Sequence, residues 1–204
     1  MAVSRHRQSA DAASAYTSYI APARVAMRYL HWFQNDLRLD DNPTLSSTLS
    51  ADSLLCVYLL PKPRPWCNLV GLGAQRDRFL RESLQELREQ LQSLGQDLMV
   101  LEGSPELVLP AVIERFEIDH LVTESTPGWH ESQALNHLRS KLEIPVTTLP
   151  GNHLFQAAQF PFSLNEYPDT FSPFRRKVEA LAITPTLPAP EALPPPPAAQ
   201  FGAI

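Results

Sequence analysis

The sequence predicts an α/β protein: a doubly wound, Rossmann-like sheet of five parallel strands, followed by a proline-rich C-terminal tail. Five short apolar runs alternate with helical patterns along the 204 residues. The runs are continuous rather than alternating, as expected for parallel strands that are covered on both faces. Consecutive parallel strands are joined by right-handed crossovers. The five predicted strands are RYLHWF (28–33), SLLCVYLL (53–60), DLMVLE (97–102), HLVTE (120–124) and PVTTL (145–149).

Helices are predicted between these strands. The first begins where Asp41 or Asn42 can cap it and Pro43 starts the turn. The strongest pattern covers residues 75–95, where leucines recur at spacings of three and four and Gly95 ends the helix. This repeat lasts barely two heptads, so we interpret it as core packing and not as a dimer zipper. The leucines are Leu80, Leu84, Leu87, Leu91 and Leu94.

Two more helices complete the predicted α/β unit. Ser104 and Pro105 form a good start for a helix that runs to about Phe116. The fourth helix is predicted from about Glu131 to Leu142. A short fifth helix is expected near 174–181, after the sheet has ended.

The chain divides into four predicted segments. Residues 1–26 are rich in Ala, Ser and Arg and are either a disordered extension or a transit peptide, unless translation starts at Met27. Residues 27–150 form the α/β domain, and 151–182 a phenylalanine-rich loop with a short helix. Residues 183–204 are a proline-rich linker or tail, expected to be extended and largely unpacked. The expected location is the cytoplasm, or a plastid or mitochondrion if the first segment is a transit peptide.

Charge and composition exclude several classes of protein. The net charge is −5, which disfavours nucleic-acid binding because phosphate neutralisation supplies most of its affinity. The only dense basic cluster is 175–177, so we expect weak or no DNA binding by this chain alone. The longest apolar run, 54–60, is too short to span a membrane. Cys56 and Cys67 lack metal or disulfide spacing and are expected to be thiols.

The loop after the first strand reads QNDLRLDDNP and contains no glycine. A dinucleotide fingerprint and a P-loop both need glycines there, because backbone amides must approach a phosphate closely. The six histidines show no metal spacing, and no nucleophile elbow is present. We therefore predict no catalytic residue and no metal site.

A ligand crevice is predicted where the first and fourth strands end, since doubly wound sheets bind ligands at the switch in strand order. Trp129 offers a stacking face and Glu131 a carboxylate for ring N–H groups. A structural alternative exists for each group: Asp36 and Arg38 can pair at a strand end, and Glu131 can favour a helix N-terminus. The predicted lining is Gln34, Asn35, Asp36 and Arg38 on one side and Trp129, His130 and Glu131 on the other.

Three motifs in order resemble the photolyase/cryptochrome family, and the DASH-type cryptochromes in particular. YLHWFQNDLRLDDNPTL (29–45) is similar to the family's first strand and loop. Residues 71–110 resemble its next helix, strand and turn, and 160–179 the segment that leaves its α/β domain. Gln34 stands where the family usually has Arg, and His31 replaces an apolar strand residue. The likeness covers the α/β domain alone.

The resemblance implies an antenna role. In the family, the α/β domain helps to hold a light-harvesting chromophore, often methenyltetrahydrofolate, while a larger helical domain holds FAD. We therefore expect a stand-alone α/β domain that binds an antenna chromophore weakly or docks onto a separately encoded helical FAD-binding domain, with no repair activity by itself. The alternatives are a truncated or split photolyase or cryptochrome DASH, and a small nucleotide-binding α/β protein of similar topology.

Five phenylalanines in the segment after the sheet are predicted to mark a docking surface, because so many exposed rings usually have a partner. The equally open alternative is that the rings fold back and cover an edge of the sheet. They are Phe155, Phe160, Phe162, Phe171 and Phe174.

Overall fold

A computed structural model describes residues 26–60, 71–155 and 157–197. The predictions for the N-terminal segment 1–25 and for Cys67 lie outside the described residues. Cys56 is buried and unpaired, as predicted. In the described part of the chain, no helix is long and apolar enough to cross a bilayer.

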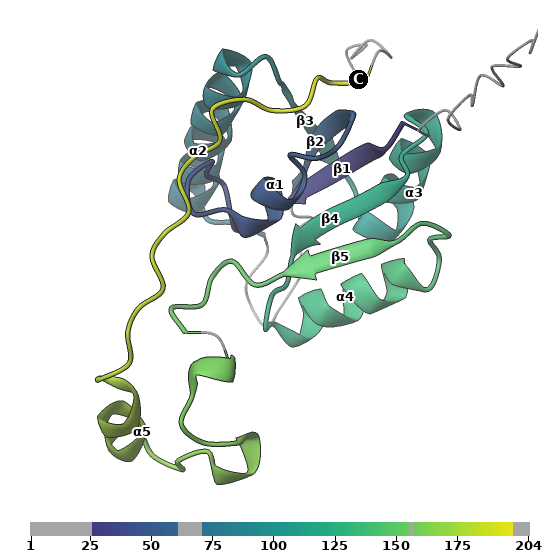
Figure 1. Cartoon of the computed structure of the whole chain (residues 1–204). Helices are drawn as coiled ribbons and strands as arrows, with labels where there is room; N and C mark the ends of the chain where they lie inside the picture. The colour runs from purple at the N-terminus through teal and green to yellow at the C-terminus, as the bar shows by residue number, and fades with distance from the viewer. Residues whose placement is uncertain (1–25, 61–70, 156, 198–204) are drawn as a thin grey trace, which may run out of the picture.

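The five strands form one parallel sheet with the order β3-β2-β1-β4-β5, which confirms the predicted doubly wound fold (Figure 1). Each predicted strand is found within one residue of its predicted start. The strands are β1 (Arg28–Phe33), β2 (Ser53–Leu60), β3 (Leu98–Glu102), β4 (His120–Glu124) and β5 (Val146–Leu149).

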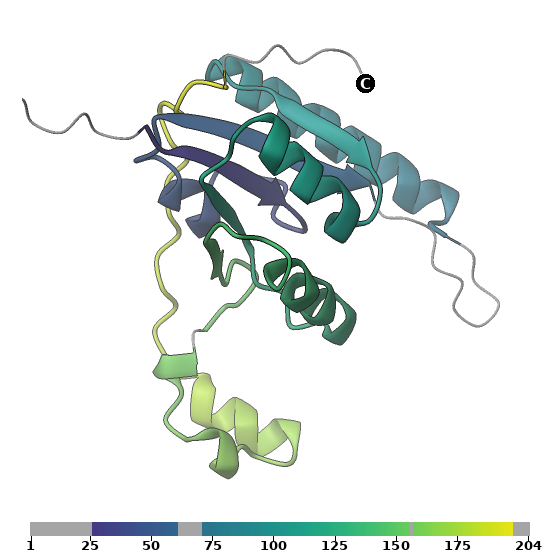
Figure 2. The same cartoon turned by 90° about the vertical axis from the view of Figure 1, so that its right-hand side faces the viewer.

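The crossover helices cover both faces of the sheet, α1 and α2 on one face and α3 and α4 on the other (Figures 1 and 2). The fourth helix begins and ends two or three residues earlier than predicted, because Gly128 takes the N-cap position. The helices are α1 (Pro43–Ser47), α2 (Ala74–Ser93), α3 (Pro105–Arg115) and α4 (Trp129–Arg139).

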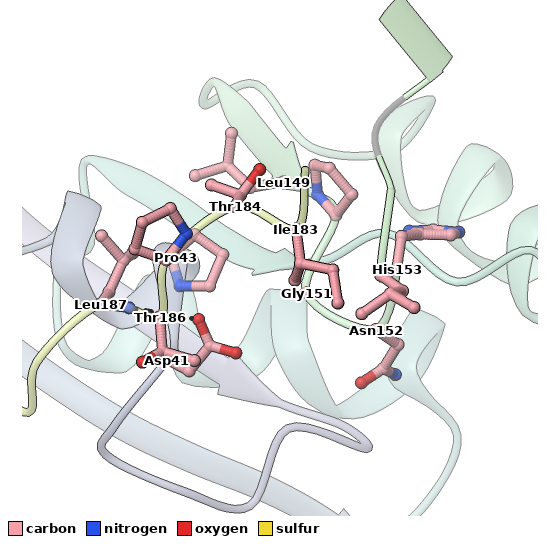
Figure 3. A pocket seen from close by; sticks show the side chains of 13 residues that line it. Asp41, Pro43, Leu149, Gly151, Asn152, His153, Ile183, Thr184, Thr186 and Leu187 are labelled. Atoms are coloured by element: carbon pink, nitrogen blue, oxygen red, sulfur yellow. Dashed lines mark hydrogen bonds between the residues drawn. The ribbon is translucent and has the colours of Figure 1, made fainter. Parts of the chain in front are cut away.

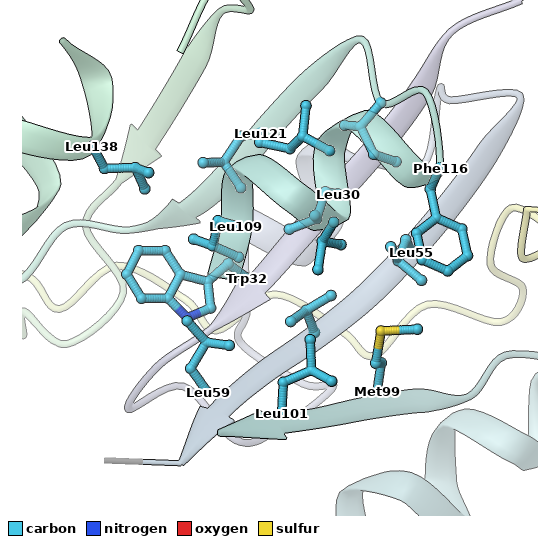
Figure 4. Close-up of a cluster of buried hydrophobic side chains, with 14 of the residues drawn as sticks. Leu30, Trp32, Leu55, Leu59, Met99, Leu101, Leu109, Phe116, Leu121 and Leu138 are labelled. Carbon is cyan, nitrogen blue, oxygen red and sulfur yellow. The ribbon is translucent and has the colours of Figure 1, made fainter. Parts of the chain in front are cut away.

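The core has two halves, one on each face of the sheet. Alternate residues of β1 point to opposite faces, so Trp32 packs beneath α3 and α4 (Figure 4). Phe33 packs beneath α1 and α2 on the other face. The predicted leucine stripe of α2 faces the second half, with Leu84, Leu87 and Leu91 buried. Burying a leucine fully contributes about 1.5–3 kcal/mol, so these layers fix the sheet that carries the site.

The start of α1 is built as the sequence predicts. Asn42 is the N-cap, and its side-chain oxygen accepts a hydrogen bond of 2.8 Å from the amide of Leu45. Pro43 follows in the first turn. At α3, Ser104 also takes the N-cap position, but its hydroxyl makes no capping hydrogen bond.

The phenylalanine-rich segment folds as a small aromatic unit, which comprises the described residues of 155–182. It contains two short 3-10 helices, η1 (Ala157–Gln159) and η2 (Leu164–Glu166), and α5 (Phe171–Val178). Figures 1 and 2 show α5 standing apart from the sheet. The rings of Phe160, Phe162 and Phe174 contact one another, so the alternative that they cover a sheet edge is not what the structure shows.

The proline-rich segment is extended and most of its described residues are exposed, but it is held on the α/β domain at a few positions. Residues 183–197, here called the strap, run back along the α/β domain (Figure 1). The carbonyl of Pro195 accepts a hydrogen bond of 2.9 Å from the amide of Leu54. Pro194 is buried, and its carbonyl accepts a hydrogen bond from the side chain of Gln96. Proline carbonyls still accept hydrogen bonds, which is why the strap can dock without forming a strand.

Candidate functional site at the switch point

Strands β1 and β4 are direct neighbours, with Tyr29 opposite His120 and Trp32 opposite Thr123. Their connections leave in opposite directions along the sheet, so the switch in strand order lies between them. The condition for the predicted crevice is therefore met. Both strands end at the same edge of the sheet, at Phe33 and Glu124.

The loop after β1 is organised around the buried carboxylate of Asp36, which is 1% exposed. Its Oδ1 accepts a hydrogen bond of 2.9 Å from the amide of Gln34, and its Oδ2 accepts one of 3.0 Å from the hydroxyl of Thr44. The side-chain amide of Asn42 donates to Oδ2 at 3.3 Å. Both oxygens of Asp36 are used within the loop, so this acid steadies the backbone.

Arg38 reaches a different element. Its Nη2 donates to the carbonyl of Asp41 at 2.8 Å and to the carbonyl of Gly151, beyond β5, at 2.9 Å. Arg38 forms no ion pair with Asp36 among the described residues. The guanidinium instead ties the loop after β1 to the loop after β5.

Gln34 bridges the two strands at the switch point. Its side-chain nitrogen donates to the hydroxyl of Thr123 at 2.9 Å and to the carbonyl of Glu124 at 3.0 Å. Gln34 is half-buried, while its neighbour Asn35 is exposed. The side chain that replaces the family's arginine is thus already engaged with β4.

The second predicted group lies at the start of α4. Trp129 is 69% exposed and packs edge-on against His130, with ring centroids 5.0 Å apart. The carboxylate of Glu131 lies against Gly128, where a β-carbon would meet its Oε2 at 2.1 Å. That position agrees with the helix-start alternative for Glu131. No hydrogen bond or ring contact joins these residues to Gln34–Arg38 in the described part of the chain, and ligand contact by Trp129, His130 and Glu131 stays a prediction.

The structure adds a residue that the sequence reasoning missed. Glu124 is the last residue of β4 and is fully buried, and neither of its carboxyl oxygens has a hydrogen-bond partner among the described residues. A β-carbon on Gly151 would lie 2.8 Å from its Oε1, so a larger residue there would force the carboxyl to shift. The available signal was an acid that ends an apolar strand run directly at the switch point.

The environment of Glu124 favours its neutral form. Burial raises the pKa of this carboxyl to about 7, and the nearby charge of Asp36 acts in the same direction. Arg38 opposes the shift, and so do the backbone amide of Asn35 and the side chain of Asn152, which approach the carboxyl as hydrogen-bond donors without reaching good geometry. A buried carboxyl with a pKa near neutrality is typical of functional sites.

His31 is the other buried titratable group near this edge. Its Nε2 lies 3.0 Å from the hydroxyl of Thr44, and its Nδ1 has no partner. Burial lowers the pKa of His31 to about 4, against the opposing effect of Asp36, so the ring is neutral at pH 7. The described residues contain no group of three or more side chains suited to a metal ion.

A cavity of about 560 Å³ lies beside this edge, between the loop after β5 and the strap (Figure 3). Asp41 and Pro43 form one wall, residues 149–154 a second and residues 183–187 the third. None of the seven predicted crevice residues lines it. Gly151 and Asn152 separate this cavity from Glu124.

The fold and this edge define a class, that of doubly wound α/β domains with a polar switch point and no glycine-rich phosphate loop. Within that class, the sequence matches the family described as DNA photolyase over residues 29–196. The chain therefore belongs to the photolyase/cryptochrome family. Members of this family bind FAD and often an antenna cofactor.

Individual relatives agree with this assignment. The chain is 35% identical over 183 residues to a cryptochrome DASH of Gloeobacter violaceus, covering 86% of this chain and 37% of that protein. It is 38% identical over 169 residues to cryptochrome-2 of Gallus gallus, covering 80% of this chain and 28% of that one. The chain thus spans only 37% and 28% of the length of these two relatives.

Solved structures share the fold. A Synechocystis cryptochrome superposes with a TM-score of 0.79 at 28% identity, over 88% of this chain and 39% of that one. A class III photolyase from Agrobacterium tumefaciens gives a TM-score of 0.73 at 23% identity, which supports the fold alone. The resemblance predicted from three sequence motifs is therefore confirmed.

Proposed function

We propose that this chain is the antenna-side α/β domain of a photolyase/cryptochrome. It binds a flat, amide-bearing ring system at the switch point between β1 and β4, and it works together with a helical FAD-binding part. Methenyltetrahydrofolate is the best candidate for the ring. The observation that carries the proposal is the buried, unpartnered carboxyl of Glu124.

The chemistry of the edge favours a ring over a phosphate. No glycine lies between Phe33 and Pro43 to bring backbone amides toward a phosphate, and Asp36 adds negative charge close by. An unpartnered carboxyl in a buried position is costly, and a ligand that donates N–H groups would relieve that cost. A pterin-type ring carries such donors on one edge.

The proposal assigns the acidic contact to Glu124 in place of Glu131. Glu131 is exposed and lies at the N-terminus of α4, where its charge already has a favourable setting. Glu124 does not lie at the N-terminus of a helix. Trp129, exposed near the same edge, keeps its proposed role as a stacking face because a ring needs an apolar cover as well as an acceptor.

The FAD of the complete system belongs to a helical part, which the aromatic unit is suited to contact. Phe171 is 73% exposed at the start of α5, and Phe160, Phe162 and Phe174 form a packed cluster in the same aromatic unit. Large exposed aromatic rings are common anchors of an interface. We propose that this face docks onto the helical part.

A titration with methenyltetrahydrofolate, followed by its absorption and by Trp fluorescence, tests the antenna proposal. We expect saturable binding with a dissociation constant on the order of micromolar or weaker, because one face of the ring stays wet without the helical part. Glu124→Gln keeps the shape and removes the charge, and it should weaken binding about tenfold or more. Glu131→Gln is the matched control and should change affinity less than about twofold.

Two results contradict the proposal. Equal binding by wild type and Glu124→Gln would remove this carboxyl from the site, and a loss confined to Glu131→Gln would move the site to the start of α4. Absence of binding at high micromolar folate would leave the domain a scaffold for the helical part.

A further inference from the structure

We propose that the cavity under the strap is a second ligand site, distinct from the switch point, which takes a small organic cation with a flat apolar body. The cavity lies between Asp41, the loop after β5 and the strap residues 183–187 (Figure 3). Its volume of about 560 Å³ falls in the range of small-molecule sites. The inference does not depend on the antenna proposal.

The lining sets the sign of the ligand's charge. Asp41 is the single acid among the lining residues, and the lining includes no Lys or Arg. The remaining polar side chains are hydrogen-bonding groups on Asn152, His153, Thr184 and Thr186. A carboxylate without a basic neighbour in the wall attracts a cation and repels an anion.

Asp41 is held in place before any ligand arrives. Its backbone is in the left-handed region, with φ of 47°. Its amide donates to the carbonyl of Leu187 at 2.8 Å, and its Oδ1 accepts from the amide of Leu187 at 3.3 Å. Arg38 fixes its carbonyl from the other side at 2.8 Å. The second carboxyl oxygen, Oδ2, has no hydrogen-bond partner in the described residues and is available to a ligand.

Arg38 does not cancel this charge preference. Its Nη2 donates to the backbone carbonyls of Asp41 and Gly151, and Arg38 is not among the residues that line the cavity. Arg38 also acts on the buried Glu124, whose pKa it lowers. The carboxylate of Asp41 is therefore the fixed charge that the lining itself presents.

The walls set the shape of the ligand. Prolines contribute rigid apolar surfaces from three separate segments, at Pro43, Pro150 and Pro185. Leu154 and Ile183 are about 60% exposed around the same hollow, at 61% and 60%. Exposed apolar side chains gathered around a cavity favour a ligand with an apolar body. A flat ring that ends in a cationic group satisfies both the walls and Asp41.

The test uses benzamidine as the cationic probe and benzoate as its anionic counterpart of nearly the same size. Titrations of the full chain are followed by amide chemical shifts in ¹⁵N-resolved NMR spectra. We expect benzamidine to shift the amides of Asp41, Asn152 and Thr186 in a saturable way, and benzoate to leave them unchanged. Asp41→Asn keeps the acceptor for Leu187 and tolerates the left-handed backbone, and it should weaken benzamidine about tenfold or more.

Asp40→Asn is the matched control, because Asp40 is the exposed neighbour with the same charge. It should change benzamidine affinity less than about twofold. Equal effects of Asp40→Asn and Asp41→Asn, equal binding of the two probes, or no saturable shift up to about 10 mM benzamidine would overturn the proposal. Glu124→Gln should leave benzamidine binding unchanged, which separates this site from the folate site.

Discussion

Two buried acids, Asp36 and Glu124, lie at neighbouring strand ends and differ in how their carboxyl oxygens are hydrogen-bonded. Asp36, in the loop after β1, accepts hydrogen bonds from Gln34, Asn42 and Thr44. Glu124, at the end of β4, has no hydrogen-bond partner among the described residues. Asp36 therefore organises the loop after β1, whereas the carboxyl of Glu124 is available to a ligand.

The contrast follows from the local backbone. Asp36 lies in a buried loop whose amide and hydroxyl donors need hydrogen-bond acceptors, and its carboxylate supplies them. Glu124 belongs to a strand whose main chain is already paired in the sheet, with β5 on one side. Its side chain therefore extends beyond the ladder toward Gly151, where donors of good geometry are lacking.

The largest effect is expected from Asp36→Ala. The change leaves the amide of Gln34 and the side chains of Asn42 and Thr44 without an acceptor in a buried loop. We expect the free energy of unfolding, measured with urea, to fall by about 4 kcal/mol. Asp40→Ala, at the exposed neighbour, should change it by less than about 0.5 kcal/mol. Equal small losses would mean that Asp36 does not organise the loop.

A smaller effect, on the pH dependence of stability, is expected at Glu124. The pKa of this carboxyl is raised from 4.5 to about 7 in the folded protein. The folded state therefore binds the proton more tightly, and the stability gained from it is complete below about pH 4.5 and is lost as pH rises through 7. The loss reaches at most about 3 kcal/mol.

Urea unfolding at pH 5 and pH 8 tests this linkage. Wild type should lose stability across this interval relative to Glu124→Gln, because the amide cannot ionise. Glu131→Gln should follow the wild-type profile, since that carboxylate is exposed. If wild type and Glu124→Gln show the same pH profile, the buried acid is not the source of the linkage.

The smallest effect is expected at the strap, where the neutral side chain of Gln96 forms buried hydrogen bonds, as the carboxylate of Asp36 does in the loop after β1. The side chain of Gln96 is buried and donates to the carbonyls of Leu54 and Pro194. Gln96→Leu should cost about 1–2 kcal/mol and should speed hydrogen exchange at the amide of Leu54, which bonds the strap. Gln92→Leu, at an exposed position on α2, serves as the control. Unchanged exchange at Leu54 would show that the strap does not depend on Gln96.

The fold could be predicted from the sequence because its signals are local. Five apolar runs, the leucine stripe of α2 and the Asn42-Pro43 start of α1 each predict their own element, and the switch between β1 and β4 follows from the order of elements. The points at which the strap contacts the domain could not be predicted, because proline content sets its extended shape while Gln96 and Leu54 decide where it docks.

The choice between two glutamates shows the same limit at the site. Glu124 and Glu131 lie seven residues apart on either side of one loop: Glu124 is the last residue of β4, and Glu131 lies in the first turn of α4. A helix start gives Glu131 a recognisable role in sequence, whereas the side chain of Glu124 is covered by Gly151, a residue distant along the chain. Tertiary packing, which sequence patterns do not display, decides between them.

The central claim is that Glu124 is a buried carboxyl without a partner, and its pKa is the most direct measurement. Carboxyl ¹³C NMR of glutamate-labelled protein follows each glutamate through pH, and Glu124→Gln assigns the signal by its loss. The account predicts one glutamate that titrates near pH 7. A Glu124 signal that titrates below about pH 5, the ordinary range of exposed glutamates, would contradict it.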